Sequence, residues 1–177
     1  MLNQIKHTFS KALASLLTHP KPFIVKPDQQ FVRRSSLSLE KMVNAILGMG
    51  GKALSKELLD LKLDVTNSAF VQRRYQIKSD LFKSLFDSFT DRIPHHIDLP
   101  ILAIDGSDVP IPRNDQDHET CIIANVGSKP YNLIHLNALF DLKRNIYVDA
   151  CVQDKRQVNE NAVSYTHLRA HETELHL

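Results

Sequence analysis

One stretch of this 177-residue chain carries the residue types of a metal site. Residues 101–107 are Ile-Leu-Ala-Ile-Asp-Gly-Ser, so Asp105 ends a short aliphatic run. A carboxylate in such a run is costly to bury unless a cation or hydrogen bonds hold its charge. Two explanations stay open at this point. Asp105 is a metal ligand, or it caps a turn made by residues 105–108.

A second group of residues suits contact with DNA. Arg33 and Arg34 form a basic pair, and a helix predicted over residues 66–77 carries the others. The candidate DNA contacts are Arg33, Arg34, Asn67, Ser68, Gln72, Arg73 and Arg74. Such side chains bind base edges and phosphates when the second helix of a helix-turn-helix enters the major groove. The alternative is that Arg73 and Arg74 are only the solvated face of a helical bundle.

Charge is divided unevenly along the chain. Residues 1–97 hold 15 Lys and Arg against 8 Asp and Glu, a net charge of +7, whereas residues 98–177 hold 7 against 12, a net charge of −5. A basic half suits a polyanion, and an acidic half suits carboxylates collected for metal or general-base chemistry. Ordinary solvated surface charge is the alternative explanation for both halves.

Hydrophobic periodicity predicts that helices occupy the first half. They are expected over residues 1–18, from Ser36 or Ser38 to Gly48, and over residues 55–61, 66–77 and 79–89. Thr66 is expected to cap the fourth of these helices. Pro20, Pro22 and Pro27 cannot continue the first helix, so an extended linker should follow it. This half is predicted to be a small helical bundle.

Beyond Pro94 the period of the apolar residues changes to two, which predicts strands. Residues 99–109 are aliphatic, as expected of a strand buried on both faces. Residues 132–153 alternate apolar and polar side chains around a connection that ends in Asn145. Because Asn tolerates a positive φ, this connection predicts an antiparallel hairpin. Three consecutive strands with Asp105 near the centre of the first are how a ribonuclease H-like domain begins, although many other α+β folds begin the same way.

The sequence offers little support for a membrane or secreted protein. No apolar run approaches the roughly 20 residues that span a bilayer. Residues 1–18 lack the continuous apolar centre of a signal peptide, so we expect a cytoplasmic protein. Cys121 and Cys151 form neither a disulfide framework nor a CxxC pair, and we expect both to be small buried side chains.

An ordered set of motifs resembles one family. The motifs are Arg-Ser-Ser-Leu-Ser-Leu at 34–39, Ala-Phe-Val-Gln-Arg-Arg at 69–74, Ile-Leu-Ala-Ile-Asp-Gly-Ser at 101–107, His-Leu-Asn-Ala-Leu-Phe-Asp-Leu at 135–142 and Gln-Val-Asn-Glu at 157–160. In this order they resemble DDE-class insertion-sequence transposases of the insertion sequence four type, over about residues 30–162. The resemblance implies a ribonuclease H-like domain that cuts and joins DNA with two divalent metal ions, Mg²⁺ or Mn²⁺, held by two Asp and one Glu.

Only the first of those three acids has a counterpart here. The resemblance assigns Asp105 as a catalytic residue and metal ligand, and it places the second Asp and the Glu beyond Ala162. One carboxylate cannot hold two ions that must activate the nucleophile and stabilise the leaving oxygen. We therefore expect this chain to bind neither ion stably and to be inactive. The full-length protein would act on transposon ends and target DNA, with a homodimer as a further expectation. The acids considered as substitute ligands are Asp141, Asp149, Asp154 and Glu160.

The last 15 residues break the preceding pattern. Residues 163–173, Val-Ser-Tyr-Thr-His-Leu-Arg-Ala-His-Glu-Thr, resemble the in-frame translation of a sequencing adapter. We expect three segments: a helical DNA-binding region at 1–97, an incomplete start of a ribonuclease H-like domain at 98–162, and an adapter-derived tail at 163–177. Two alternatives are a stand-alone DNA-binding or regulatory protein and an unrelated ribonuclease H-like nuclease.

Overall fold

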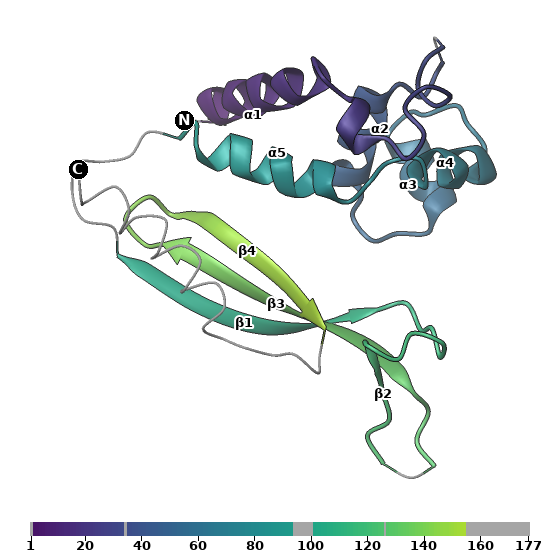
Figure 1. Cartoon of the computed structure of the whole chain (residues 1–177), viewed down its shortest axis with the longest axis vertical. Helices are drawn as coiled ribbons and strands as arrows, with labels where there is room; N and C mark the ends of the chain where they lie inside the picture. The colour runs from purple at the N-terminus through teal and green to yellow at the C-terminus, as the bar shows by residue number, and fades with distance from the viewer. Residues whose placement is uncertain (1, 34, 94–100, 126, 155–177) are drawn as a thin grey trace. The chain divides into compact units, whose positions relative to one another are not determined.

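The computed structural model of the chain describes residues 2–33, 35–93, 101–125 and 127–154. The chain divides into two compact units, Met1–Pro94 and His95–Leu177. Within the described residues the first unit holds five α-helices and the second a four-stranded antiparallel sheet (Figure 1). The prediction of a mixed α+β protein is confirmed. The tail expected at 163–177 lies outside the described residues. None of the described helices is long and apolar enough to cross a bilayer.

The helices of the first unit lie close to their predicted positions. They are α1 Leu2–Leu17, α2 Leu39–Gly48, α3 Leu54–Asp60, α4 Asn67–Arg74 and α5 Asp80–Thr90. The Ser38 hydroxyl accepts a hydrogen bond from the Lys41 amide at 3.3 Å, and the Thr66 hydroxyl accepts one from the Ala69 amide at 3.2 Å. The predicted Thr66 cap is therefore confirmed, and Ser38 rather than Ser36 caps α2. Each hydroxyl satisfies an amide that the first helical turn leaves without a partner.

Two local predictions in this unit are wrong for one reason. The linker after α1 is not simply extended, since a 3₁₀ turn spans Lys21–Phe23 and Ile24 is only 3% exposed. The predicted helix over 66–77 ends at Arg74 instead. Ile77 forms an antiparallel bridge with Ile24. This tertiary contact replaces the last predicted turn of the helix at Ile77, and it orders the linker at Ile24.

Two apolar clusters hold the helical unit together. The first joins α1, α2 and α5 around Val43 and Leu81, and the second joins α2, α3 and α4 around Met42 and Phe70. α2 therefore supplies adjacent residues to both clusters. Figure 1 shows α1 and α5 side by side, and Phe9 and Phe89 meet between them with ring centroids 6.2 Å apart. Packing of this kind, rather than helix propensity alone, stabilises helices as short as these.

The sheet consists of β1 Leu102–Ile111, β2 Cys121–Ile122, β3 Tyr131–Asp141 and β4 Ile146–Asp154. β3 lies between β1 and β4 and pairs antiparallel with both, and the short β2 pairs with the beginning of β3 (Figure 1). The predicted hairpin between β3 and β4 is confirmed, with Asn145 at a φ of 57°. Asp141 fixes the turn, because its carboxylate accepts hydrogen bonds from the amides of Lys143 and Arg144 at 2.9 and 3.0 Å.

β1 differs from its prediction in two respects. Asp105 and Asp108 lie within the strand, opposite Ala138 and His135 of β3, so the turn explanation for residues 105–108 is wrong. The expectation of a strand buried on both faces is also wrong, because residues 104–108 are exposed. A strand is buried on both faces only where another layer packs against each face, and the described elements of this unit form a single sheet.

Candidate functional site

Asp105 lies near the centre of β1 with its side chain exposed. It is directly opposite Ala138 of β3, which is directly opposite Ala150 of β4. Side chains of directly opposite residues share a face of the sheet, so Asp105 stands beside two small apolar residues. Its exposure removes the argument that burial requires a bound cation. It also leaves the carboxylate accessible to a metal ion or to DNA.

Three other acids of the sheet, Asp108, Asp141 and Asp149, do not share the face of Asp105. Successive side chains in a strand point to opposite faces. Asp108 and Asp149 are opposite His135 and Leu139 of β3, and Asp141 belongs to the same alternate set. These three acids lie on the far face from Asp105 and cannot bind the same ion. The side chain of Asp154, and all of Glu160, lie outside the described residues.

The donor set therefore fits only part of a two-metal site. Carboxylate oxygens are suitable ligands for Mg²⁺, and Asp105 can supply one such ligand. Within the described ranges, no three His, Cys, Asp or Glu side chains come together in a way that could hold a metal ion. Asp105 can thus contribute to a metal site, but the described residues do not complete one.

The face of the sheet opposite Asp105 holds a polar cluster that the sequence did not predict. His135 and Asn137 of β3 are 7% and 0% exposed. His135 Nδ1 lies 2.8 Å from a carboxylate oxygen of Asp108 on β1, and the Asn137 amide donates to the Gln153 side chain on β4 at 3.0 Å. These contacts tie all three long strands together. The only sequence signal was the alternation of His135 and Asn137 with apolar residues, and alternation does not say which face is covered.

Gly106 makes this cluster possible. A Cβ atom at Gly106 would lie 2.8 Å from His135 Nε2 and 3.0 Å from Asn137 Oδ1. Both of these atoms are buried, and neither has a hydrogen-bond partner among the described residues. The two side chains thus pack directly over a glycine of the neighbouring strand. Gly106 serves close packing here, because its φ is not positive.

α4 presents an exposed polar surface, which we call the α4 surface, made by Asn67, Ser68, Gln72 and Arg74. On its other side, Phe70 is fully buried and anchors the helix in the second apolar cluster. The Arg74 guanidinium lies 5.7 Å from the ring centroid of Tyr75, which is 71% exposed. Residues 61–66 separate α3 from α4, a longer connection than the roughly three or four residues of a typical helix-turn-helix.

Arg73 points away from the α4 surface. Its Nε donates to the backbone carbonyl of Leu37 at 3.3 Å, and its Nη1 donates to the Gln76 side chain at 3.0 Å. The guanidinium also lies 4.4 Å from the centroid of the Phe31 ring. Arg33 is exposed and lines the same pocket as Arg73, while Arg34 lies outside the described residues. The six predicted DNA contacts that the structure describes therefore do not form one surface.

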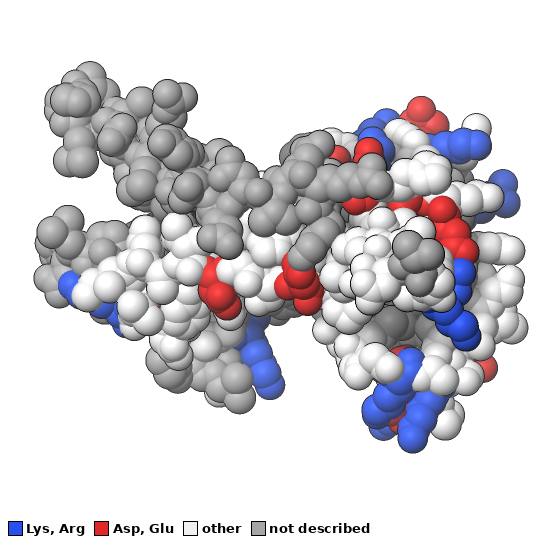
Figure 2. Space-filling model, turned by 90° about the horizontal axis from the view of Figure 1, so that it is seen from below, with Lys and Arg blue, Asp and Glu red and all other residues white. Residues whose placement is uncertain are grey.

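Some basic side chains of the helical half have acidic neighbours. On the face drawn in Figure 2, the coloured basic and acidic side chains lie among one another, without a continuous basic area. Lys52 and Asp60 form an exposed ion pair at 2.5 Å, and the hydrogen bond from Lys52 to Asp60 raises the pKa of Lys52. Because this pair is neutral overall, Lys52 adds little attraction for a polyanion.

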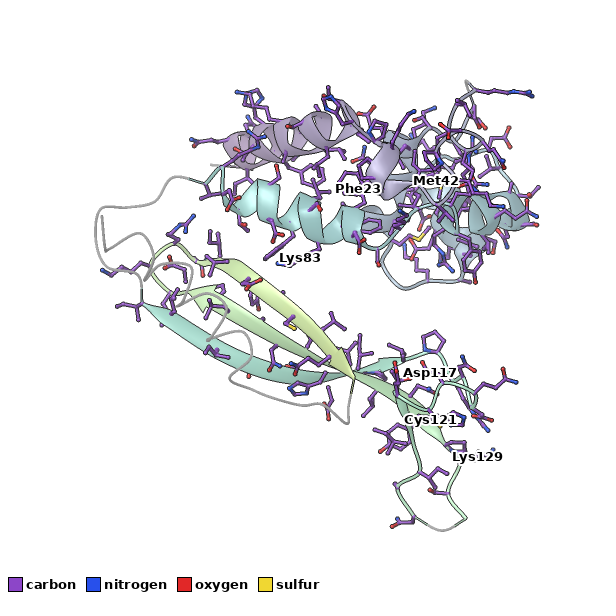
Figure 3. All side chains as sticks on the ribbon, viewed as in Figure 1. Phe23, Met42, Lys83, Asp117, Cys121 and Lys129 are labelled. Atoms are coloured by element: carbon purple, nitrogen blue, oxygen red, sulfur yellow. The ribbon has the colours of Figure 1, made fainter. Side chains whose placement is uncertain are left out.

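The acidic loop before β2 is organised by its own hydrogen bonds. Figure 3 shows Asp117 and Cys121 at this end of the sheet. The Thr120 hydroxyl donates to Asp117 at 2.8 Å, and this hydrogen bond lowers the pKa of the Asp117 carboxyl. Asn132, which is 1% exposed, bonds to both Asn114 and Thr120. These contacts give the loop a structural role. Cys121 and Cys151 are half-buried, so their predicted full burial is wrong.

Comparison of the chain with protein-family models finds no matching family, and comparisons with curated proteins and with solved structures find no significant match.

Proposed function

We propose that this chain is the amino-terminal part of a transposase that cuts and joins DNA by metal-dependent phosphodiester transfer. In this proposal the helical unit binds DNA, and the sheet is the first part of a ribonuclease H-like catalytic domain. Asp105 supplies one carboxylate ligand for a divalent ion, Mg²⁺ or Mn²⁺, whose role would be to activate the attacking oxygen and stabilise the leaving one.

The observation that carries the proposal is the position of Asp105 in the sheet. A ribonuclease H-like domain begins with three antiparallel strands in sequence order and an acid within the first. β1, β3 and β4 have this connectivity, with β3 between the other two and Asp105 exposed near the middle of β1. The short β2 is an addition within the connection between β1 and β3. An exposed carboxylate among small side chains leaves room for both an ion and a nucleic-acid backbone.

The α4 surface supports the DNA-binding part of the proposal. Asn and Gln side chains pair with adenine edges, and Arg pairs with guanine or with phosphates. Asn67, Gln72 and Arg74 are all exposed on one short helix that Phe70 anchors in the core. A helix with exposed amide and guanidinium groups is a suitable element for groove contact.

A second candidate function is a DNA-binding or regulatory protein without catalytic activity. The observation in its favour is that Asp105 is the only acid with a described side chain on its face of the sheet. The two candidates share the DNA-binding unit and differ only in the sheet. Sequencing the locus past Ala162 separates them, since a further Asp on a strand and a Glu on a helix favour the transposase.

The DNA-binding part is tested by a mobility shift of the 177-residue chain on duplex DNA. For three or four phosphate contacts, raising the salt from 50 to 200 mM should weaken binding about 40- to 150-fold, because each contact releases counterions. Arg74→Glu should weaken binding more than Lys11→Glu, its matched control on α1. No shift at low salt would refute DNA binding. Equal losses in the two variants would remove the α4 surface from the interface.

A further inference from the structure

The helical unit contains a pocket whose polar residues lie apart from the α4 surface. It has a volume of about 460 Å³ and lies between the end of α1, the start of α2 and the segment that precedes α2. Leu17 and Leu39 contribute an apolar floor, and Arg33, Ser35 and Arg73 contribute polar groups. Two arginines that line one pocket favour an anionic ligand.

Arg73 is held in place before any ligand binds. Nε and Nη1 are occupied by Leu37 and Gln76, and the guanidinium plane rests near the Phe31 ring at 4.4 Å. Nη2 makes no hydrogen bond to any described residue, so its donors are available to a ligand. Because the side chain is already ordered, binding an anion costs little additional rotamer entropy.

Arg33 and Ser35 supply the remaining donors. Arg33 is exposed and forms no ion pair within the described parts of the chain. The oxygen of Ser35 accepts a hydrogen bond from the Leu37 amide at 3.2 Å, which leaves its hydroxyl proton free to donate. Ser38 also lines the pocket and accepts from the Lys41 amide in the same manner.

The charge of the pocket distinguishes between anions. Glu40 lines it together with the two arginines, so the formal charge of its lining is +1. A phosphodiester carries one negative charge, whereas a phosphate monoester carries up to two, and Glu40 would repel the second. The apolar floor suits a group with carbon on its other side, such as a deoxyribose. Both features fit an internal phosphate of a nucleic-acid strand.

We propose that this pocket binds one backbone phosphodiester of bound DNA, and that Arg33, Arg73 and the Ser35 hydroxyl donate hydrogen bonds to its oxygens. This inference rests on the proposed DNA-binding function and divides the contacts into two groups. The α4 surface reaches the groove, and the pocket anchors the backbone. Phosphate contacts position a protein on the duplex, while base contacts provide sequence specificity.

The test is fluorescence anisotropy of the 177-residue chain with a labelled duplex. Arg33→Gln removes an exposed side chain that forms no described ion pair, so the variant should fold normally. Loss of one phosphate contact should weaken binding at least threefold and reduce the salt slope by about 0.9. Arg92→Gln is the matched control, because Arg92 is also exposed and does not line the pocket, and it should bind as the unaltered chain does. Arg73→Lys keeps the charge but loses the planar fork and should also weaken binding.

A set of duplexes with one neutral methylphosphonate at each position in turn locates the contact. The unaltered chain should lose affinity at the position that enters the pocket, and Arg33→Gln should lose nothing further there. If the unaltered chain binds DNA and Arg33→Gln behaves like Arg92→Gln, the pocket inference is overturned and the proposed function is not. If the unaltered chain does not bind DNA, the proposed function fails first.

Discussion

Replacing Gly106 with Ala should destabilise the sheet, although glycine is usually the worse residue within a strand. The new Cβ would lie 2.8 Å from His135 Nε2 and 3.0 Å from Asn137 Oδ1. Real Cβ atoms do not approach so closely, so one or both side chains must move. His135 is hydrogen-bonded to Asp108 and Asn137 to Gln153, and both moving groups are buried. Moving these side chains away from the new methyl group therefore disturbs the hydrogen bonds that join β3 to β1 and β4.

The expected magnitude follows from opposing effects. Overpacking of a buried site costs about 1–3 kcal/mol, and a weakened hydrogen bond adds about 1 kcal/mol. Ala lowers the entropy of the unfolded chain relative to Gly, which returns roughly 0.4–1 kcal/mol. The net loss should be about 1–3.5 kcal/mol. In a His135→Ala background much of this loss should disappear, because Nε2 is the closest atom to the new methyl group.

The assay is native-state amide hydrogen exchange of β3, which reports the stability of the sheet separately from that of the helices. Ser107→Ala is the control, since Ser107 is exposed on the other face, and it should change stability by less than about 0.5 kcal/mol. The reasoning is refuted if Gly106→Ala lowers protection no more than Ser107→Ala. It is also refuted if the loss is the same with His135 and without it.

Three further predictions concern activity, pH and a buried acid. With Mg²⁺ or Mn²⁺ this chain should not nick supercoiled DNA, and Asp105→Ala should leave DNA binding unchanged; nicking that Asp105→Ala abolishes would reveal a metal site that we have not recognised. Thr120→Val should raise the pKa of Asp117 towards its ordinary value in an NMR titration, because the hydroxyl that lowers it is removed. The stability that this hydrogen bond contributes is present above the ordinary carboxyl pKa and is lost as pH falls through the lowered folded-state pKa. An unchanged Asp117 pKa in the variant would contradict the assignment. Glu57 is 4% exposed and accepts from two backbone amides at 2.9 and 2.6 Å, so Glu57→Ala should cost about 1–3 kcal/mol in urea unfolding, and a cost below about 0.5 kcal/mol would show that the carboxylate does not hold the loop.

Local features of the fold were predictable because they depend on neighbours in sequence. A hydroxyl at position 38 or 66 caps a helix through amides three residues away, and the hairpin turn needs a residue that tolerates positive φ at 145. Such interactions are complete within one turn or one connection. The boundaries failed where a distant segment intervened, as when Ile24 pairs with Ile77 and ends the predicted helix early.

The candidate site was predictable by residue type but not by arrangement. The sequence identified Asp105 as an acid on a strand and contained basic residues suited to contact with DNA. It did not show that Asp108 and Asp149 lie on the far face from Asp105, because that follows from the pairing of β1 and β4 with β3. The separation of Arg73 from Arg74 likewise depends on Leu37 and Phe31, which precede Arg73 by more than 30 residues.

Taken alone, the sequence determined where helices give way to strands, since the period of the apolar residues is a local property of the chain. The tertiary structure decided which face of β3 is covered and why Gly106 is a glycine. Alternation divides the side chains of a strand into two faces, but it does not say which face is buried. Only the tertiary structure shows that His135 and Asn137 are on the buried face of β3. It also shows that both side chains pack against Gly106 of β1, where a Cβ atom would be too close to them.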